Sequence, residues 1–156
     1  MWRYVAFAVI VALVGLGSPP PGHATGDLTK QRPIEVRVEL GTAHGAHKFV
    51  PSDLRFETGK LYKLVLSNPS RSKHYFTSPG LARRVYTRKV QVVDATGVRA
   101  EIKGVVNEIE VYPGGTAEWW FVPVASGDLH DLHCHVSGGD GRTHADAGMR
   151  GTISIR

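Results

Sequence analysis

The sequence predicts an all-β protein with a single domain, built as an antiparallel sandwich or barrel. Short runs of alternating apolar and polar residues recur roughly every ten residues, with turn-forming residues between them. No long segment repeats its apolar residues with the period of a helix. The 156 residues contain no internal repeat, low-complexity tract or linker, so we expect one core.

The first expected strands lie early in this domain. Residues 34–40, IEVRVEL, alternate strictly between apolar and polar, which is typical of a half-buried strand. Residues 48–68 contain two more strand-like runs, with Pro51 and Gly59 as the breaks.

The later elements follow the same pattern, with one exception. Residues 80–89, GLARRVYTRK, are the best candidate for a short helix. Residues 89–104 predict a β-hairpin whose turn lies at residues 94–97. Further strands are expected within 107–123, where two strands flank a Pro-Gly-Gly turn, and at 129–134 and 151–156.

The N-terminal residues predict export. Arg3 precedes an apolar run of residues 4–16, and small residues follow near Ala24, as in a secretory signal peptide. The run is shorter than the ~20 residues of a membrane span, although an uncleaved anchor is an alternative. We expect a signal peptide at 1–24, a polar lead-in at 25–33 and the domain at 34–156, with no stable membrane insertion after cleavage.

The charge of the chain excludes a nucleic-acid-binding function. The net charge is +5, but acidic and basic residues are interleaved and no nucleic-acid-reading motif is present. One small basic cluster is the exception, formed by Arg83, Arg84, Arg88 and Lys89. We interpret it first as a solvated face and second as a docking patch for an acidic partner.

The single cysteine, Cys134, is the strongest functional signal. It cannot form an internal disulfide, and a lone thiol in an exported protein is explained by intermolecular pairing, by a reactive role or by a bound metal. A thiolate, two histidines and a weak axial methionine form the trigonal blue-copper arrangement. Cys134, His144 and Met149 lie close together near the C-terminus, and His74 is the natural fourth member of the set. Zinc also accepts cysteine and histidine but seldom methionine.

Two segments carry a resemblance to a known family. Residues 111–116, V-x-P-G-G-T, and residues 144–153, H-x4-M-x-G-T-I, resemble those of the cupredoxins, the plastocyanin- and azurin-like copper proteins. The resemblance extends over residues 47–156 and implies a Greek-key β-sandwich binding one copper ion, Cu(I) or Cu(II). In that family a histidine follows a strand ending in asparagine, here His74 after Asn68. The remaining ligands come in the order Cys134, His144, Met149.

The resemblance also implies a function. The most similar relatives are small periplasmic bacterial proteins, so we expect a monomeric, periplasmic, non-enzymatic carrier that passes one electron at a time between transient partners. The alternative is a copper-buffering or copper-delivery protein that receives its ion from a donor protein. No nucleophile–base pair or paired carboxylates indicate catalysis. Residues 135–143 depart from the family pattern as an apparent insertion between Cys134 and His144.

The other histidines are expected to play smaller parts. His133 and His135 flank Cys134 on a strand, so both should point away from the metal, and we interpret them as solvated. The minor alternatives are that the pair binds a second metal ion or receives copper from a partner, and that His135 or His133 replaces His144 as a ligand. His44 and His47 fit a polar loop better than a loose ion site. Asn68 is either a residue that orients the ligand loops or a plain turn residue.

Overall fold

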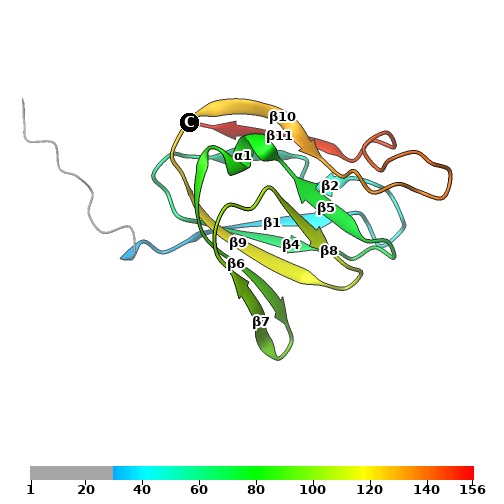
Figure 1. Ribbon diagram of the computed structural model, residues 1–156, viewed down its shortest axis with the longest axis horizontal. Helices are drawn as coiled ribbons and strands as arrows, with labels where there is room; N and C mark the ends of the chain where they lie inside the picture. Colours follow the sequence, from blue (N-terminus) through cyan, green and yellow to red (C-terminus); the bar gives the residue numbers. More distant parts are fainter. Residues whose placement is uncertain (1–29) are drawn as a thin grey trace, which may run out of the picture.

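The computed structural model describes residues 30–156, which form two facing β-sheets (Figure 1). The six-stranded sheet has the order β2-β1-β4-β9-β6-β7, with strands β1 (Ile34–Leu40), β2 (Phe49–Val50), β4 (Tyr62–Ser67), β6 (Val85–Asp94), β7 (Gly97–Ile102) and β9 (Thr116–Pro123). The five-stranded sheet has the order β3-β11-β10-β5-β8, with strands β3 (Asp53–Phe56), β5 (His74–Thr77), β8 (Glu108–Val111), β10 (Gly127–His133) and β11 (Arg150–Ile155). The predicted all-β sandwich is confirmed.

Two strand pairings differ from the antiparallel arrangement expected from the sequence. β1 pairs with β4 in parallel, and β3 pairs with β11 in parallel. Parallel neighbours need a long crossover instead of a tight turn, and in both pairs other chain segments intervene. Alternation of apolar and polar residues sets which face of a strand is buried but not the direction of its neighbour, so the sequence pattern could not specify this.

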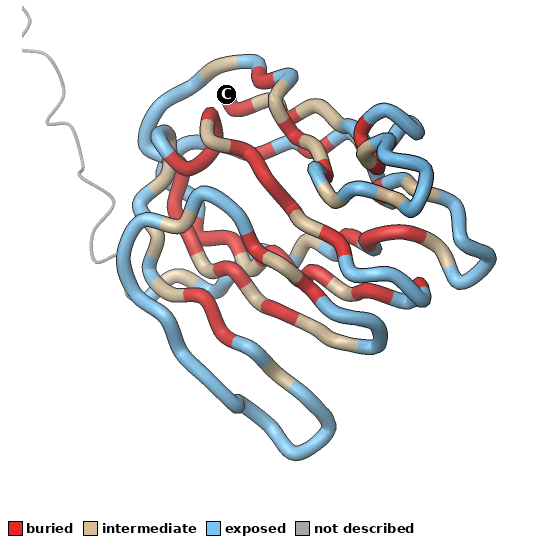
Figure 2. Tube along the Cα trace, turned by 45° about the vertical axis from the view of Figure 1, so that its right-hand side comes forward, coloured by how far each residue is buried: buried red, intermediate tan, exposed pale blue. Residues whose placement is uncertain are grey.

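The core lies between the two sheets, where the red segments of Figure 2 face one another. Alternation in β9 sends Trp119 and Phe121 inward, and both are fully buried. Their rings meet edge to face with centroids 5.3 Å apart. The hairpin of β6 and β7, which the sequence predicted, extends beyond this core and is largely exposed (Figure 2).

The helix predicted within residues 80–89 is wrong in its extent. Helix α1 covers only Pro79–Ala82, and Ser78 caps it by accepting a hydrogen bond from the Leu81 N–H. The chain then joins β6, whose Val85 pairs with Pro123 of β9. Sheet pairing therefore overrides the helical pattern of the second half of this segment. Among residues 30–156, no helix is long and apolar enough to cross a membrane.

Candidate metal centre

Three potential donor atoms meet at one end of the five-stranded sheet. His74 begins β5, and Cys134 directly follows β10. His144 lies in the loop before β11. The Cys134 Sγ is 3.8 Å from His74 Nδ1 and 3.5 Å from His144 Nδ1, and the two nitrogens are 3.0 Å apart. As the first residue of β5, His74 is held by the sheet.

These separations fit a single bound ion. Metal bonds of about 2.0 Å to nitrogen and 2.3 Å to sulfur, spread at 120°, leave donor atoms roughly 3.5–3.7 Å apart. The observed separations of 3.0, 3.5 and 3.8 Å bracket these values. Two imidazole nitrogens and one sulfur are also the donor types that copper accepts. The residues therefore fit a type 1-like copper site.

Met149 lies beside this triad on the same loop. Its side chain is fully buried and belongs to the same core cluster as Cys134. The Cys134 N–H donates to the Met149 carbonyl at 3.2 Å, and the Met149 N–H donates to the His144 carbonyl at 2.9 Å. The backbone thus draws all three loop residues of the predicted set into one compact turn.

The apparent insertion after Cys134 projects outward without opening this turn. The His144 N–H donates to the Val136 carbonyl at 2.8 Å, and the Ala145 N–H donates to the Cys134 carbonyl at 2.9 Å. Beyond these bonds, Ser137 and Thr143 form an antiparallel bridge that closes the base of the extra residues. His144 consequently returns beside Cys134 despite the longer interval.

The Cys134 thiol is buried and accepts a hydrogen bond from the backbone N–H of Tyr75. Burial raises the pKa of the Cys134 thiol, because a thiolate is poorly solvated there, while the Tyr75 N–H that donates to Sγ at 3.3 Å works in the opposite direction. Without a cation the thiol is therefore neutral at physiological pH. A bound metal ion would supply the positive charge that stabilises the thiolate.

The two histidines are neutral and able to act as ligands at physiological pH. Burial, and then the nearby His144 and His47, lower the pKa of His74 to about 4. Burial and His47 also lower the pKa of His144. Metal binding needs the neutral imidazole, so the environment that disfavours protonation favours coordination.

A hydrogen-bonded chain orients His74. The Ser70 hydroxyl lies 2.9 Å from His74 Nε2, 2.7 Å from Asn68 Oδ1 and 2.9 Å from the Ser72 carbonyl. The last two groups only accept, so the hydroxyl proton goes to one of them and His74 Nε2–H must donate to Ser70. This tautomer leaves the Nδ1 lone pair of His74 pointing toward His144 and Cys134.

Asn68 holds the Ser70 hydroxyl in place through further hydrogen bonds. Its amide donates to the carbonyls of Ser72 and Val111, each at 2.8 Å, and its Oδ1 also accepts from the Ser70 N–H. Of the two interpretations of Asn68, the structure supports the one in which it orients the ligand loops. The loop that carries Ser70 is tied through it to the end of β8.

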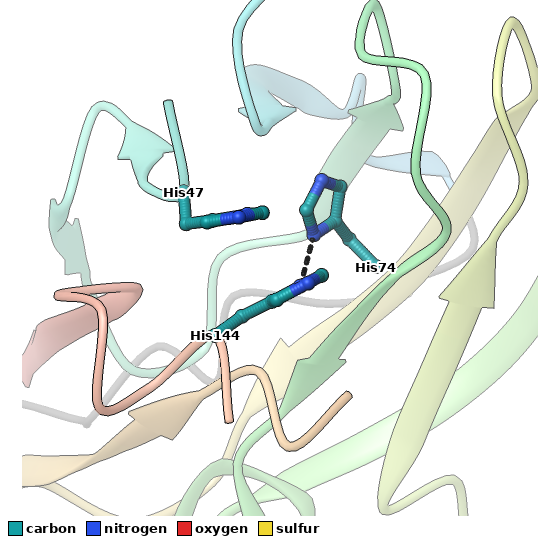
Figure 3. Close-up of side chains that lie close together, drawn as sticks. All are labelled: His47, His74 and His144. Atoms are coloured by element: carbon teal, nitrogen blue, oxygen red, sulfur yellow. Dashed lines mark hydrogen bonds between the residues drawn. The ribbon is translucent and has the colours of Figure 1, made fainter. Parts of the chain in front are cut away.

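His47 lies at this site although the sequence favoured a polar loop for it over an ion site. Its ring stacks on His144 with centroids 3.9 Å apart and planes at 18°, as Figure 3 shows. Ligand atoms of His47, His74 and His144 all lie within 4.8 Å of one another. His47 lies in the loop between β1 and β2, as expected, but its ring packs against two of the candidate ligands. The spacing of His44 and His47, weighed against a polar loop as a loose ion site, was the sequence signal for it.

The loop fold explains how His47 reaches the site. Gly41 turns the chain after β1 with φ of +75°, and its N–H donates to the Lys48 carbonyl, so the loop closes just beyond His47. A Cβ on Gly41 would come within 2.5 Å of His74 Nε2. The backbone of this loop therefore packs directly on the His74 ring, and no larger residue fits there.

The histidines that flank Cys134 take no part in the triad. His133 Nδ1 lies 2.7 Å from the Asp131 carbonyl. The His135 ring stacks on Tyr75 with centroids 4.3 Å apart, and its Nδ1 lies 3.3 Å from Thr77 Oγ1. Of His135 and His144, the structure brings His144 to the Cys134 sulfur.

Comparison with known proteins gives structural but not sequence relatives. No protein-family model and no curated protein matches the sequence. A laccase from Pediococcus acidilactici aligns with a TM-score of 0.54 and 15% identity over 80% of this chain and 27% of its own. A multicopper oxidase from Campylobacter jejuni aligns with a TM-score of 0.52 and 16% identity over 80% of this chain and 30% of its own.

A Cu-containing nitrite reductase from Thermus scotoductus also aligns, with a TM-score of 0.52 and 13% identity over 79% of this chain and 31% of its own. This chain thus spans less than a third of the length of each of these three proteins. At such identities the likeness establishes the fold alone. The chain has the cupredoxin-like β-sandwich that the sequence resemblance implied.

Proposed function

We propose that this protein binds one copper ion, which His74, Cys134, His144 and Met149 would hold, and carries single electrons between exported partners. The observation that carries the proposal is the mutual approach of one sulfur and two imidazole nitrogens to within 3.8 Å. Structural relatives named as multicopper oxidase and Cu-containing nitrite reductase support copper as the metal.

The scaffold suits a site that changes oxidation state without moving. When bound, copper supplies the one-electron chemistry, with imidazoles suited to Cu(II) and thiolate and thioether to Cu(I). All four side chains are nearly inaccessible, with exposed fractions of 1% for His74, 0% for Cys134, 4% for His144 and 0% for Met149. Burial excludes water, and the hydrogen bonds at Ser70 and Tyr75 hold the donor atoms in place.

The basic cluster at residues 83–89 is the surface on which an acidic partner would dock. Arg83 and Arg88 are exposed. Lys89 instead lies over the Trp120 ring at 4.8 Å, and Arg84 donates to the Gly80 carbonyl. The two exposed arginines are the members of the cluster that can reach a partner, and such charges mainly raise the rate of encounter.

Copper buffering or delivery is the second candidate function. The observation that favours it is His47, an additional imidazole next to the His74–His144 pair. A carrier of electrons needs a permanently held ion, whereas a carrier of copper needs one that can be exchanged, and an extra donor at the rim assists exchange. Reversible voltammetry without loss of metal would favour the electron carrier.

We propose that the protein acts in the periplasm as a monomer, with a non-catalytic role. The signal peptide predicted at residues 1–24 lies outside the described residues and stays a prediction. Cell fractionation and N-terminal sequencing of the processed protein test it.

The visible absorption spectrum of the protein with one equivalent of Cu(II) tests the copper site. We expect an intense thiolate-to-copper band that is lost in Cys134→Ser and shifted in Met149→Leu. His130→Phe is the matched control, since His130 is exposed on β10 and outside the site. A pale spectrum that does not depend on Cys134 would refute the proposed ligand set.

A further inference from the structure

His47 offers a donor that the proposed copper site does not use. Its ring lies against His144 and is 5.7 Å, centroid to centroid, from His74 in an edge-on arrangement (Figure 3). The ligand atoms of the three imidazoles lie within 4.8 Å of one another. Three imidazoles are a sufficient ligand set for Cu(II) or Zn(II) once the His47 nitrogen moves closer to the other two.

The His47 imidazole also has an unsatisfied polar atom. Its Nδ1 is inaccessible to solvent and has no hydrogen-bond partner. An unpaired buried polar atom costs roughly 1–3 kcal/mol, so most folded proteins avoid one. A metal ion shared with the neighbouring imidazoles would satisfy this nitrogen.

His47 stands between the buried donors and solvent. A pocket of about 410 Å³ is bounded by residues 43–47 on one side and 70–74 on the other, and both His47 and His74 line it. Cys134, His144 and Met149 are buried and do not line this pocket. An ion arriving through the pocket therefore meets His47 and His74 before it meets the sulfur.

We propose that His47, His74 and His144 form a second coordination set, a three-imidazole site that captures Cu(II) before Cys134 binds it. This inference rests on the proposed copper site, with which it shares two residues. In the exchange the Cys134 thiolate replaces the His47 imidazole: the sulfur–metal bond forms and the nitrogen–metal bond breaks. The thiol proton passes to the released imidazole or to water, and no electron moves.

The stacking of His47 explains why the two sets alternate. The His47 and His144 rings are stacked, with centroids 3.9 Å apart and planes at 18°, so their in-plane lone pairs run side by side and do not converge on one ion. His47 must therefore tilt to coordinate and returns to the stack once the thiolate has bound. Gly45 has φ of +86°, and a Cβ built there would meet no atom within 4 Å, so the loop has an unobstructed glycine at which it can adjust.

The first experiment isolates the three-imidazole set in the Cys134→Ser background. Cu(II) affinity is measured by competition with a chelator, and the number of coordinated nitrogens by the hyperfine splitting in electron paramagnetic resonance. We expect one Cu(II) bound by three nitrogens. His47→Phe, which keeps a planar ring for stacking, should reduce affinity at least about tenfold, since even outer partners of ligands contribute about 10–100-fold. His130→Phe should leave it unchanged.

The second experiment follows loading in the protein that retains Cys134. After rapid mixing with Cu(II), His47→Phe should slow the growth of the thiolate band at least fivefold and leave its final height unchanged. Equal affinity and nitrogen count with and without His47, or equal loading rates, would overturn the inference. If the wild-type thiolate band never forms while the three-nitrogen site is present, the proposed function and the transfer to Cys134 both fail, and only the three-imidazole set stands.

Discussion

Removal of the Ser70 hydroxyl should weaken copper binding without rearranging the fold. Ser70 touches no metal in the proposed site, but it is the acceptor for His74 Nε2–H at 2.9 Å. Ser70→Ala removes the acceptor that fixes the proton on His74 Nε2. The proton can then move to Nδ1, where it blocks the lone pair that would bind the metal. Ser70 is therefore a positioning residue, and its loss should act through His74.

The structure sets the size of the effect. In Ser70→Ala, Asn68 Oδ1 still accepts a hydrogen bond from the backbone N–H of residue 70, and the Ser72 carbonyl still accepts one from the Asn68 side-chain amide. His74 Nε2 and the Ser72 N–H both lose the Ser70 hydroxyl as a partner, and of these two residues only His74 is buried. One buried unsatisfied group costs about 1–3 kcal/mol, so the free energy of unfolding of the copper-free protein should fall by that amount. Copper affinity should fall roughly 10–100-fold, as for other partners of metal-bound histidines.

The assay combines three measurements on one variant. Denaturant unfolding gives the stability, chelator competition gives the copper affinity, and nitrogen chemical shifts of His74 report its tautomer. Ser72→Ala is the matched control, because it removes an exposed hydroxyl two residues away while keeping the backbone carbonyl that the network uses. A Ser70→Ala protein with wild-type affinity and an unchanged His74 tautomer would refute the reasoning.

Three further outcomes follow from the same geometry. The free energy of unfolding of the copper-free protein should fall by up to about 3 kcal/mol as the pH falls from 6.5 toward 4. His74 has a pKa of about 4 in the folded protein, so the unfolded chain takes up this proton at higher pH. An unfolding midpoint independent of pH over this range would contradict the prediction. Gly41→Ala should lower both stability and copper affinity, since the new methyl meets His74 Nε2 at 2.5 Å where φ is +75°; unchanged affinity in chelator competition would exclude that contact. Replacing residues 138–142 by Asn-Gly should leave the thiolate band intact, because the bonds that return His144 lie outside this stretch; a lost band would show that the extra residues shape the site.

The sequence allowed much of the fold to be predicted because its signals are local. Residues 34–40 became β1, and the turn at residues 94–97 joins β6 to β7. Burial on one face of a strand imposes alternation within a few residues, so it can be recognised without tertiary information. The helix predicted in residues 80–89 was too long because β6 pairs with β9, a contact that local propensity does not record.

The candidate ligands were predictable from chemistry, but their surroundings were not. Cys134, His144 and Met149 stand out as rare residue types close together near the C-terminus. Ser70 is one serine among several, and nothing in its neighbours indicates that its hydroxyl faces His74. Its role depends on where the chain bends after β4, which the Asn68 network sets.

By itself the sequence determined that this chain is a β-sandwich carrying a sulfur–imidazole donor set, because side-chain alternation and donor chemistry are properties of the residues themselves. Only the tertiary structure decided that His47 stacks on His144 and that the residues between Cys134 and His144 fold outward. Those features arise because loops that are distant in the sequence meet at the same end of the sheet. Their positions follow from backbone hydrogen bonds and close packing at Gly41, which no local pattern encodes.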